Sequence, residues 1–214
     1  EIVSRDWSSD VCSSDLFREL QVVHAPVVEE GGRLTLAFED FEGQRFRLVA
    51  DETKVPGNPW APSPVPAEHQ ILGLGPIRLS VPDGDALDAV LTQVMGFRAG
   101  ASFTESAARG EATGREVRVY HMAGAGPQAE LQVRLDPEAA PARAGAGGVH
   151  HVAFRTTTFG DHEAWCGRLR DLRVPNSGLV DRYYFRSLYF REPNGILFEI
   201  ATDGPGFAAD EPME

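Results

Sequence analysis

The segment LYFREPNGILFEIATD, residues 188–203, decides the fold because its pattern occurs a second time in the chain. Shifting the sequence by 152 positions places it on LAFEDFEGQRFRLVAD, residues 36–51, without a gap. Aromatic positions, the turn Gly and the final Asp coincide, and the same shift aligns FREL at 17–20 with LRDL at 169–172. Recurrence at a fixed spacing is typical of a structural repeat, so we predict one module that is used more than once.

The copy at the C-terminal end is complete. Residues 148–157 are rich in β-favouring side chains and predict a strand. Residues 160–172 predict a helix with Asp161 as its N-cap and an apolar face formed by Trp165, Leu169 and Leu172. Two strands are expected within 176–191, and the last strand follows a turn at 192–195. The module is therefore β-α-β-β-β, and we predict an α+β fold built from βαβββ modules.

A weaker third copy lies in the middle of the chain. Strands are predicted at 73–81, 115–122 and 129–135, with a helix at 85–96 that is capped by Asp85. Segments rich in Pro, Gly and Ala separate the copies. The predicted organisation is an adapter-like artefact at 1–16, the C-terminal remnant of module 2 at 17–52, a linker at 53–70, module 3 at 71–135, a linker at 136–147, module 4 at 148–203 and a tail at 204–214.

The opening segment breaks the repeat. RDWSSDVCSSDL at 5–16 occupies a place where the repeat requires helical sequence. It lacks the basic start and the apolar stretch of a secretory signal, and a disordered acidic tail is the plain alternative. The segment resembles a translated sequencing adapter. We therefore exclude residues 1–16 from the interpretation, expect authentic sequence to begin at Phe17, and expect the parent protein to continue upstream.

Composition narrows the classes of function. The 214 residues carry a net charge of −12, which argues against nucleic acid or an anionic membrane as a partner. The two cysteines do not suggest a disulfide framework, and no apolar run approaches the roughly 20 residues of a membrane span. We expect a cytoplasmic protein that binds a small molecule, and a homo-oligomer is compatible with this composition.

Ionisable side chains within apolar strands are concentrated in module 4. His150 and His151 are adjacent in the first strand, so alternation places them on opposite faces. Glu199 shares a face of the last strand with Leu197 and Ala201 and is expected to be at least half buried. A buried carboxylate is costly unless it is paired or bound to metal.

The turn between the last two strands sets the neighbours of Glu199. The sequence Pro-Asn-Gly at 193–195 suits a three-residue hairpin loop with Gly195 in the left-handed conformation. That loop places Tyr189 directly opposite Glu199, whereas a two-residue loop would place Leu188 there.

These residues leave two interpretations open. The histidines are satisfied strand residues and Glu199 pairs with Arg182 or Arg191, or the group is a metal site. In the first copy, Arg47 and Ala37 occupy the places of Glu199 and Tyr189, so the polar residues do not recur with the framework. That difference favours a site that only one module carries.

The residues HHVAF at 150–154, DRYYFRSLYFREPNGILFEIATD at 181–203 and GPGFAADE at 204–211 resemble a known family. They are similar to the end of a ring-cleaving dioxygenase of the vicinal oxygen chelate superfamily, to which glyoxalase I and the bleomycin-resistance proteins also belong. The hydroquinone-type extradiol enzymes are the branch that the chain resembles most. The resemblance covers residues 17–214 and is most distinctive over 148–210.

The resemblance implies cupped sheets around Fe(II) or Mn(II), held by two His and one Glu, with O₂ as co-substrate. The implied ligands in this chain are His151 and Glu199. Arg182 would stabilise an anionic phenolate, and Tyr189 would bind substrate or oxygen and assist proton transfer. His150 would support the neighbouring His.

The third ligand, a His, is not expected within this chain. Module 3 carries Gly75 and Pro76 where His150 and His151 would align. In the hydroquinone-type branch the resemblance assigns this His to the first module, which pairs with the last, while modules 2 and 3 pair with each other. Glu130, near the seam of modules 2 and 3, is then structural or exposed.

The sequence therefore predicts a fragment of a non-haem Fe(II) dioxygenase that cleaves the ring of a hydroquinone- or catechol-like phenol. We expect the fragment to be inactive alone, because two ligands hold a metal weakly. The alternatives are a glyoxalase-type metal-dependent lyase or isomerase and a non-enzymatic protein that binds small aromatic molecules on the same scaffold. Metal content and oxygen uptake distinguish the three.

Overall fold

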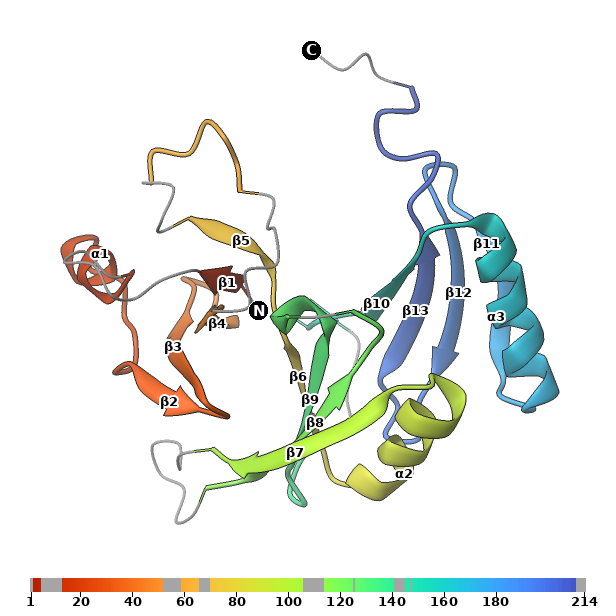
Figure 1. The fold of residues 1–214 in the computed structure, drawn as a ribbon, viewed down its shortest axis with the longest axis horizontal. Coiled ribbons are helices and arrows are strands. Elements are labelled where there is room, and N and C mark those ends of the chain that lie inside the picture. The colour runs from red at the N-terminus through yellow and green to blue at the C-terminus, as the bar shows by residue number, and fades with distance from the viewer. Residues whose placement is uncertain are drawn as a thin grey trace. The chain divides into compact units, whose positions relative to one another are not determined.

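The computed structural model divides the chain into two compact units (Figure 1). Unit 1 comprises Glu1–Gly84 and Phe97–Pro137, and unit 2 comprises Asp85–Gly96 and Glu138–Glu214. Each unit is considered by itself. The structure describes residues 2–4, 13–51, 59–65, 70–105, 114–124, 126–140, 145–146 and 148–210.

Unit 2 contains a four-stranded sheet with one long helix beside it (Figure 1). In chain order its elements are β10 (Val152–Thr156), α3 (Phe159–Asp171), β11 (Asn176–Asp181), β12 (Arg186–Arg191) and β13 (Leu197–Thr202). The strand order is β10-β13-β12-β11, with β10 parallel to β13 and the other pairs antiparallel. This is the predicted βαβββ connectivity, and the two strands expected within 176–191 are both present.

Helix α3 packs against all four strands of this sheet. Leu169 and His162 are fully buried on its inner side, whereas Leu172, which the sequence placed on the apolar face, is 47% exposed. The predicted N-cap was wrong. Thr158 caps the helix, since its hydroxyl oxygen accepts a hydrogen bond from the backbone N–H of Asp161. Asp161 instead lies in the first turn, where a carboxylate favours the helix dipole.

The hairpin between β12 and β13 has the predicted three-residue loop. Glu192 and Ile196 close it through a backbone hydrogen bond, and Gly195 has φ 91°, the left-handed conformation that the loop requires. The register that follows pairs Tyr189 with Glu199. The prediction that placed these two side chains opposite each other is confirmed.

Unit 1 contains a second sheet with the same connectivity. Its strands are β6 (Ile77–Val81), β7 (Arg98–Thr104), β8 (Glu116–His121) and β9 (Glu130–Leu135), in the order β6-β9-β8-β7. The chain between β6 and β7 forms α2 (Gly84–Ala89), which continues as a π-helical turn, η2 (Val90–Val94). From Asp85 onward this helical segment belongs to unit 2. A short 3₁₀ turn, η3 (Pro127–Ala129), precedes β9. Leu87, Leu91 and Met95 are the buried apolar side chains of this helical segment.

Three predictions for this part of the chain need correction. The strand expected at 73–81 is two strands, because β5 (Ile71–Leu74) and β6 lie in different sheets and are separated by Gly75-Pro76. A proline has no N–H for a sheet ladder, which explains the break. Helix α2 begins at Gly84, so Asp85 lies inside its first turn. Strand β7, RAGASFT, was missed because it is an exposed edge strand without apolar alternation.

The remaining sheet of unit 1 has five strands in the order β2-β3-β4-β1-β5. It consists of β5 together with β1 (Ile2–Ser4), β2 (Val28–Glu30), β3 (Arg33–Glu39) and β4 (Arg45–Ala50). Between β1 and β2 lies α1 (Ser13–Glu19). This helix begins before Phe17, the residue at which we expect authentic sequence to start. The connectivity from β1 to β4 is again βαβββ.

The shift of 152 positions also holds in the strand pairing. The backbone pair Ile2↔Leu48 falls on Phe154↔Ile200, so β1 lies beside β4 in the register that β10 has beside β13. The adapter interpretation concerns the origin of residues 1–16, of which 1 and 5–12 lie outside the described residues, and it stays a prediction. The module boundaries stay predictions in the same way.

All three sheets confirm the predicted α+β class with βαβββ connectivity. Within the described residues, no helix is long and apolar enough to cross a bilayer. The catalytic candidates all lie in unit 2, and the arrangement of its strands determines how they meet.

Candidate metal centre

The face of the unit 2 sheet that α3 does not cover carries the predicted site. Alternation buries Val152, Phe154, Phe198 and Ile200 on the helix side. The opposite face of β10 and β13 then carries Ala153, which pairs with Glu199 across the parallel ladder. His151 lies just before β10, and its imidazole reaches Glu199. Two candidate ligands that are 48 positions apart in the sequence are thus neighbours.

His151 and Glu199 are in direct contact. The His151 Nε2 atom lies 2.7 Å from Glu199 Oε2. The Glu199 side chain is 3% exposed and that of His151 is 34% exposed, so the carboxylate is buried and the imidazole reaches solvent. A hydrogen bond in this pair places a proton where a metal ion would otherwise lie, because metal ligation needs both groups deprotonated.

Ser187 is a site residue that the sequence interpretation missed. It is fully buried in β12, and its Oγ donates a hydrogen bond to Glu199 Oε1 over 2.5 Å. Strand alternation could have indicated it, because Ser187 lies two residues before Tyr189 and therefore on the same face. A serine without a recognisable motif carries little signal until its partner is known.

His150 contacts His151 directly. Their Nδ1 atoms lie 2.9 Å apart and the rings meet edge to face. One nitrogen must donate and the other accept, because two lone pairs would repel. If the His151 Nδ1–H donates to His150, the Nε2 lone pair of His151 becomes available to a metal ion once the proton shared with Glu199 Oε2 has left, and this is the tautomer that a metal ligand needs.

Arg182 and Tyr189 form a second pair beside the first. The Arg182 Nη2 atom lies 3.5 Å from the Tyr189 hydroxyl, and its guanidinium carbon is 5.4 Å from the centroid of the Tyr189 ring. The Tyr189 ring in turn meets the His151 ring at 6.1 Å between centroids. The predicted site residues are therefore linked by contacts that run from His150 through His151 and Tyr189 to Arg182. The prediction that placed His150 and His151 on opposite faces of the strand was wrong, because β10 begins only at Val152 and both histidines precede it.

The alternative pairing of Glu199 with an arginine is not found. Among the described residues, Glu199 makes no ion pair with Arg182 or Arg191. Arg191 instead donates a hydrogen bond to the backbone carbonyl of Gly195. The Glu199 carboxylate is satisfied by Ser187 and His151 instead.

The donor set fits a metal in part. An imidazole nitrogen and a carboxylate oxygen that converge on one face suit two positions of a two-His, one-carboxylate site. The described residues contain no group of three His, Cys, Asp or Glu side chains that could hold a metal ion. The described part of the chain thus offers two donors, His151 and Glu199, of the three that such a site needs.

The equivalent positions of unit 1 carry no such donors. Gln132 lies between Arg78 on β6 and Val119 on β8, as Glu199 lies between Ala153 and Tyr189. The Arg78 guanidinium donates two hydrogen bonds to Gln132 Oε1, at 2.8 and 2.6 Å. Gln132 thus stands where the sheet of unit 2 has Glu199, and Arg78 stands where it has Ala153.

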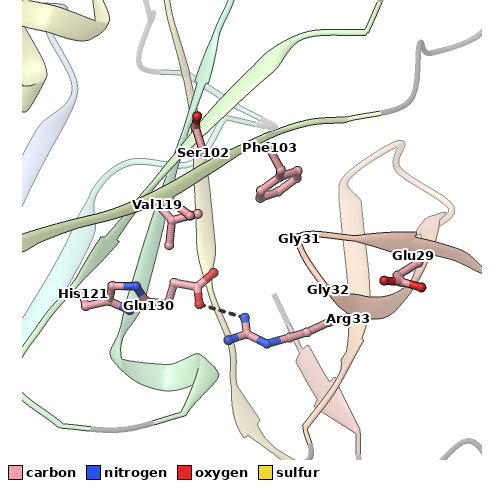
Figure 2. A pocket seen from close by; sticks show the side chains of 10 residues that line it. Glu29, Gly31, Gly32, Arg33, Ser102, Phe103, Val119, His121 and Glu130 are labelled. Atoms are coloured by element: carbon pink, nitrogen blue, oxygen red, sulfur yellow. Dashed lines mark hydrogen bonds and ion pairs between the residues drawn. The ribbon is translucent and has the colours of Figure 1, made fainter.

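Glu130 was predicted to be either structural or exposed, and the structure shows that it is structural. It is 4% exposed, its Oε2 lies 2.8 Å from Nη1 of Arg33, and its Oε1 accepts a hydrogen bond from Gln132. Figure 2 shows Arg33, at the start of β3, reaching Glu130 on β9. The two carboxylate oxygens are therefore both engaged.

A pocket of about 460 Å³ opens beside this ion pair in unit 1 (Figure 2). Phe103 and Val119 form apolar parts of its wall, and His121 and Glu29 form polar parts. None of the predicted site residues lines it, and its Arg33 and Glu130 pair with each other. We therefore place the candidate site at the His151–Glu199 pair and not at this pocket.

Known proteins share the sequence and the fold. Residues 73–200 match the profile of the family described as "Glyoxalase/Bleomycin resistance protein/Dioxygenase superfamily". The "Putative ring-cleaving dioxygenase MhqA" of Bacillus subtilis (strain 168) is 42% identical over 92% of this chain and 61% of its own length. The "Chlorohydroquinone/hydroquinone 1,2-dioxygenase" of Sphingobium indicum is 28% identical over 90% of this chain and 58% of its own length.

A crystal structure of a "putative dioxygenase" from Bacillus subtilis subsp. subtilis str. 168 superimposes with a TM-score of 0.78 at 27% identity. The match covers 98% of this chain and 63% of that protein. The chain thus spans less than two thirds of the length of each of these relatives.

Proposed function

Because the chain belongs to the glyoxalase/bleomycin resistance protein/dioxygenase superfamily, we propose that it is part of a metal-dependent dioxygenase that opens the ring of a hydroquinone-like phenol with O₂. The observation that carries the proposal is the contact of His151 Nε2 with Glu199 Oε2 at 2.7 Å on the uncovered face of the sheet. The names of the relatives from Bacillus subtilis and Sphingobium indicum support this class of reaction.

His151 and Glu199 would hold the metal, with the third ligand supplied from outside the described residues. Their nitrogen and oxygen donors suit Fe(II), and also Mn(II). A ferrous ion held there would supply the redox chemistry by which O₂ attacks an aromatic ring in the extradiol manner. With two ligands the chain alone would bind metal weakly, so we expect it to be inactive by itself.

The other site residues would act on the substrate. The Arg182 guanidinium, whose positive charge is always present, would attract a phenolate oxygen and stabilise negative charge on the ring. The Tyr189 hydroxyl, 3.5 Å from Arg182 Nη2, would donate a hydrogen bond to the substrate or return a proton to it. His150 would hold His151 in the tautomer that leaves Nε2 free.

The setting of the reaction is part of the same proposal. A net charge of −12 does not favour nucleic acid as a partner, and the free thiol of Cys166 suits the reducing cytoplasm. The partner that we propose is a small aromatic molecule, as the names of the relatives suggest.

Replacing Glu199 tests the assignment. We expect Glu199→Ala to lower iron-dependent consumption of hydroquinone and O₂ by at least about 100-fold in the full-length protein, because even supporting residues of metal ligands account for factors of this size. The matched control is Glu163→Ala, an exposed carboxylate on α3. Oxygen uptake and hydroquinone loss are measured together, with Fe(II), Mn(II), Zn(II) and Ni(II) supplied in turn.

Turnover that Glu199→Ala leaves unchanged would contradict the proposed site. Activity with Zn(II) or Ni(II) and without oxygen uptake would instead identify a glyoxalase-type lyase or isomerase. Binding of the aromatic molecule without any metal dependence would identify a binding protein.

A further inference from the structure

Both oxygens of the Glu199 carboxylate have a separate partner. Oε1 accepts the hydrogen bond from Ser187 Oγ at 2.5 Å, and Oε2 lies 2.7 Å from His151 Nε2. Ser187 is fully buried, and Glu199 is 3% exposed. The serine hydroxyl has no competition from solvent, so its proton is directed to one oxygen only.

The direction of this hydrogen bond restricts the carboxylate. A bond held in a buried setting costs more to break than one at the surface, because the orphaned oxygen loses its partner without regaining water. The Glu199 side chain therefore resists rotation, and Oε2 is the oxygen left to face His151. A carboxylate held in this way offers a metal one oxygen instead of two.

The two sheets of unit 1 show that the serine accompanies the carboxylate. Ser187 pairs with Ala201, and the corresponding pairs are Thr35↔Val49 on β3 and β4 and Val117↔Arg134 on β8 and β9. The Thr35 hydroxyl donates to the backbone carbonyl of Arg33, and Val117 has no hydroxyl.

The acceptor position changes in parallel. Where unit 2 has Glu199, the two sheets of unit 1 have Arg47 and Gln132. In the described structure, a hydroxyl that donates across the strands, that of Ser187, thus occurs in the sheet that carries the acidic residue Glu199. Packing of the sheet alone does not require the serine, because valine and threonine fill the same place elsewhere.

We propose that Ser187 is a positioning residue, which holds Glu199 so that Oε2 alone ligates the metal beside His151. This inference rests on the proposed function, because it concerns the same ligand. It adds a residue that determines the geometry and the affinity of the metal site without touching metal or substrate.

The test measures metal binding by the chain itself rather than turnover. Co(II) is titrated into the unaltered chain and into Ser187→Ala, Ser187→Thr and Glu199→Ala. Binding is followed by calorimetry, by paramagnetic broadening of the histidine ring signals, which also reports weak binding, and by the visible spectrum of Co(II). Thr156→Val is the matched control, since Thr156 is a buried residue of β10 on the opposite face of the same sheet.

We expect Ser187→Ala to raise the dissociation constant for Co(II) by about 10-fold or more and to change the Co(II) spectrum as the second carboxylate oxygen becomes available. Ser187→Thr keeps the hydroxyl, so its dissociation constant for Co(II) should lie within about 2-fold of that of the unaltered chain. Its Co(II) spectrum should match that of the unaltered chain. Thr156→Val should leave Co(II) binding unchanged even where its melting temperature falls, which separates loss of stability from loss of positioning.

Two outcomes overturn different statements. If Ser187→Ala binds Co(II) as the unaltered chain does while Glu199→Ala has lost binding, the positioning role is wrong and the metal site stands. If Glu199→Ala binds Co(II) unchanged, or the unaltered chain binds none, the metal assignment fails and the role of Ser187 fails with it.

Discussion

At the scale of single residues, the same strand positions carry different chemistry in the three sheets. Glu199, Gln132 and Arg47 occupy equivalent places in the ladders, yet only the first is partnered by a histidine and a serine. The backbone pairing is the same around each of them. The chemistry of the site is therefore a property of a few side chains and not of the scaffold, as is general for folds that host many functions.

A salt bridge at the end of the same face yields a prediction about pH. The Arg155 guanidinium donates two hydrogen bonds to Asp203, at 2.6 and 2.7 Å. These bonds, aided by the positive charge, hold the pKa of the Asp203 carboxyl below its usual value of 3.8. A lowered pKa stabilises the fold above the unfolded value, and this contribution is lost as the pH falls through the folded pKa.

We therefore expect an NMR titration of the Asp203 side-chain carbon to give a pKa below 3.8 in the unaltered chain and a return toward that value in Arg155→Gln. Because both side chains are largely exposed, high salt should reduce the difference. Arg170→Gln, on the exposed side of α3, is the control. An unchanged pKa in Arg155→Gln would show that the guanidinium is not its cause.

At the scale of elements, the β12–β13 hairpin determines which side chains meet. A loop one residue shorter would pair Leu188 with Glu199 and would turn Tyr189 to the other face. The observed loop needs Gly195 at φ 91°. One glycine thus fixes the register on which the contact of Tyr189 with His151 depends.

Replacing this glycine should destabilise the hairpin. We expect Gly195→Ala to lower the free energy of unfolding by about 1–2 kcal/mol, because an alanine in the left-handed region meets its own backbone. The space around Gly195 is open, so the cost is conformational and not steric crowding. Denaturant unfolding measures the change.

Gly167→Ala is the matched control. Gly167 lies in the interior of α3, nothing lies within 4 Å of an added Cβ, and alanine favours a helix, so we expect a gain of about 0.5–1 kcal/mol. If both substitutions change stability in the same direction, the argument from the left-handed conformation is wrong.

At the scale of the whole molecule, the described strands of unit 1 repeat the module architecture of unit 2, with Gln132 and Arg47 in the place of Glu199. Between its sheets, Arg78 Nη1 lies 2.7 Å from Glu105 and 3.2 Å from Glu30, and Arg47 contacts the same two carboxylates. Arg134 also contacts Glu105. Arginines and glutamates thus form ion pairs with one another in unit 1, where unit 2 has His151 and Glu199. This pairing indicates a structural role for unit 1.

Breaking this network should lower the stability of unit 1. We expect Arg78→Met to lower the free energy of unfolding by about 3 kcal/mol, because it leaves buried Glu105 and Glu30 with one partner fewer. Arg45→Met is the control, since Arg45 and Glu39 are 3.7 Å apart and exposed, and it should change the value by less than about 1 kcal/mol. Equal losses in the two variants, measured by denaturant unfolding, would contradict a buried network.

The sequence by itself determined the module, its repetition at 152 positions, the hairpin loop and the pairing of Tyr189 with Glu199. His151 and Arg182 are site candidates through the resemblance to ring-cleaving dioxygenases. Periodicity and turn chemistry are local properties, so they can be read along the chain. The N-cap of α3, the break at Pro76 and the edge strand β7 were decided by competition between neighbouring signals, which sequence patterns resolve poorly.

The partners of Glu199 were decided by tertiary structure alone. The parallel ladder brings His151 beside it, the antiparallel ladder brings Ser187 across from Ala201, and the two arginines that the sequence offered as partners are engaged elsewhere. Ion pairs in unit 1, such as Arg33 with Glu130, likewise join residues far apart in the chain. Such contacts depend on distances between strands that no local pattern contains, because register and crossover connection together set which side chains share a face.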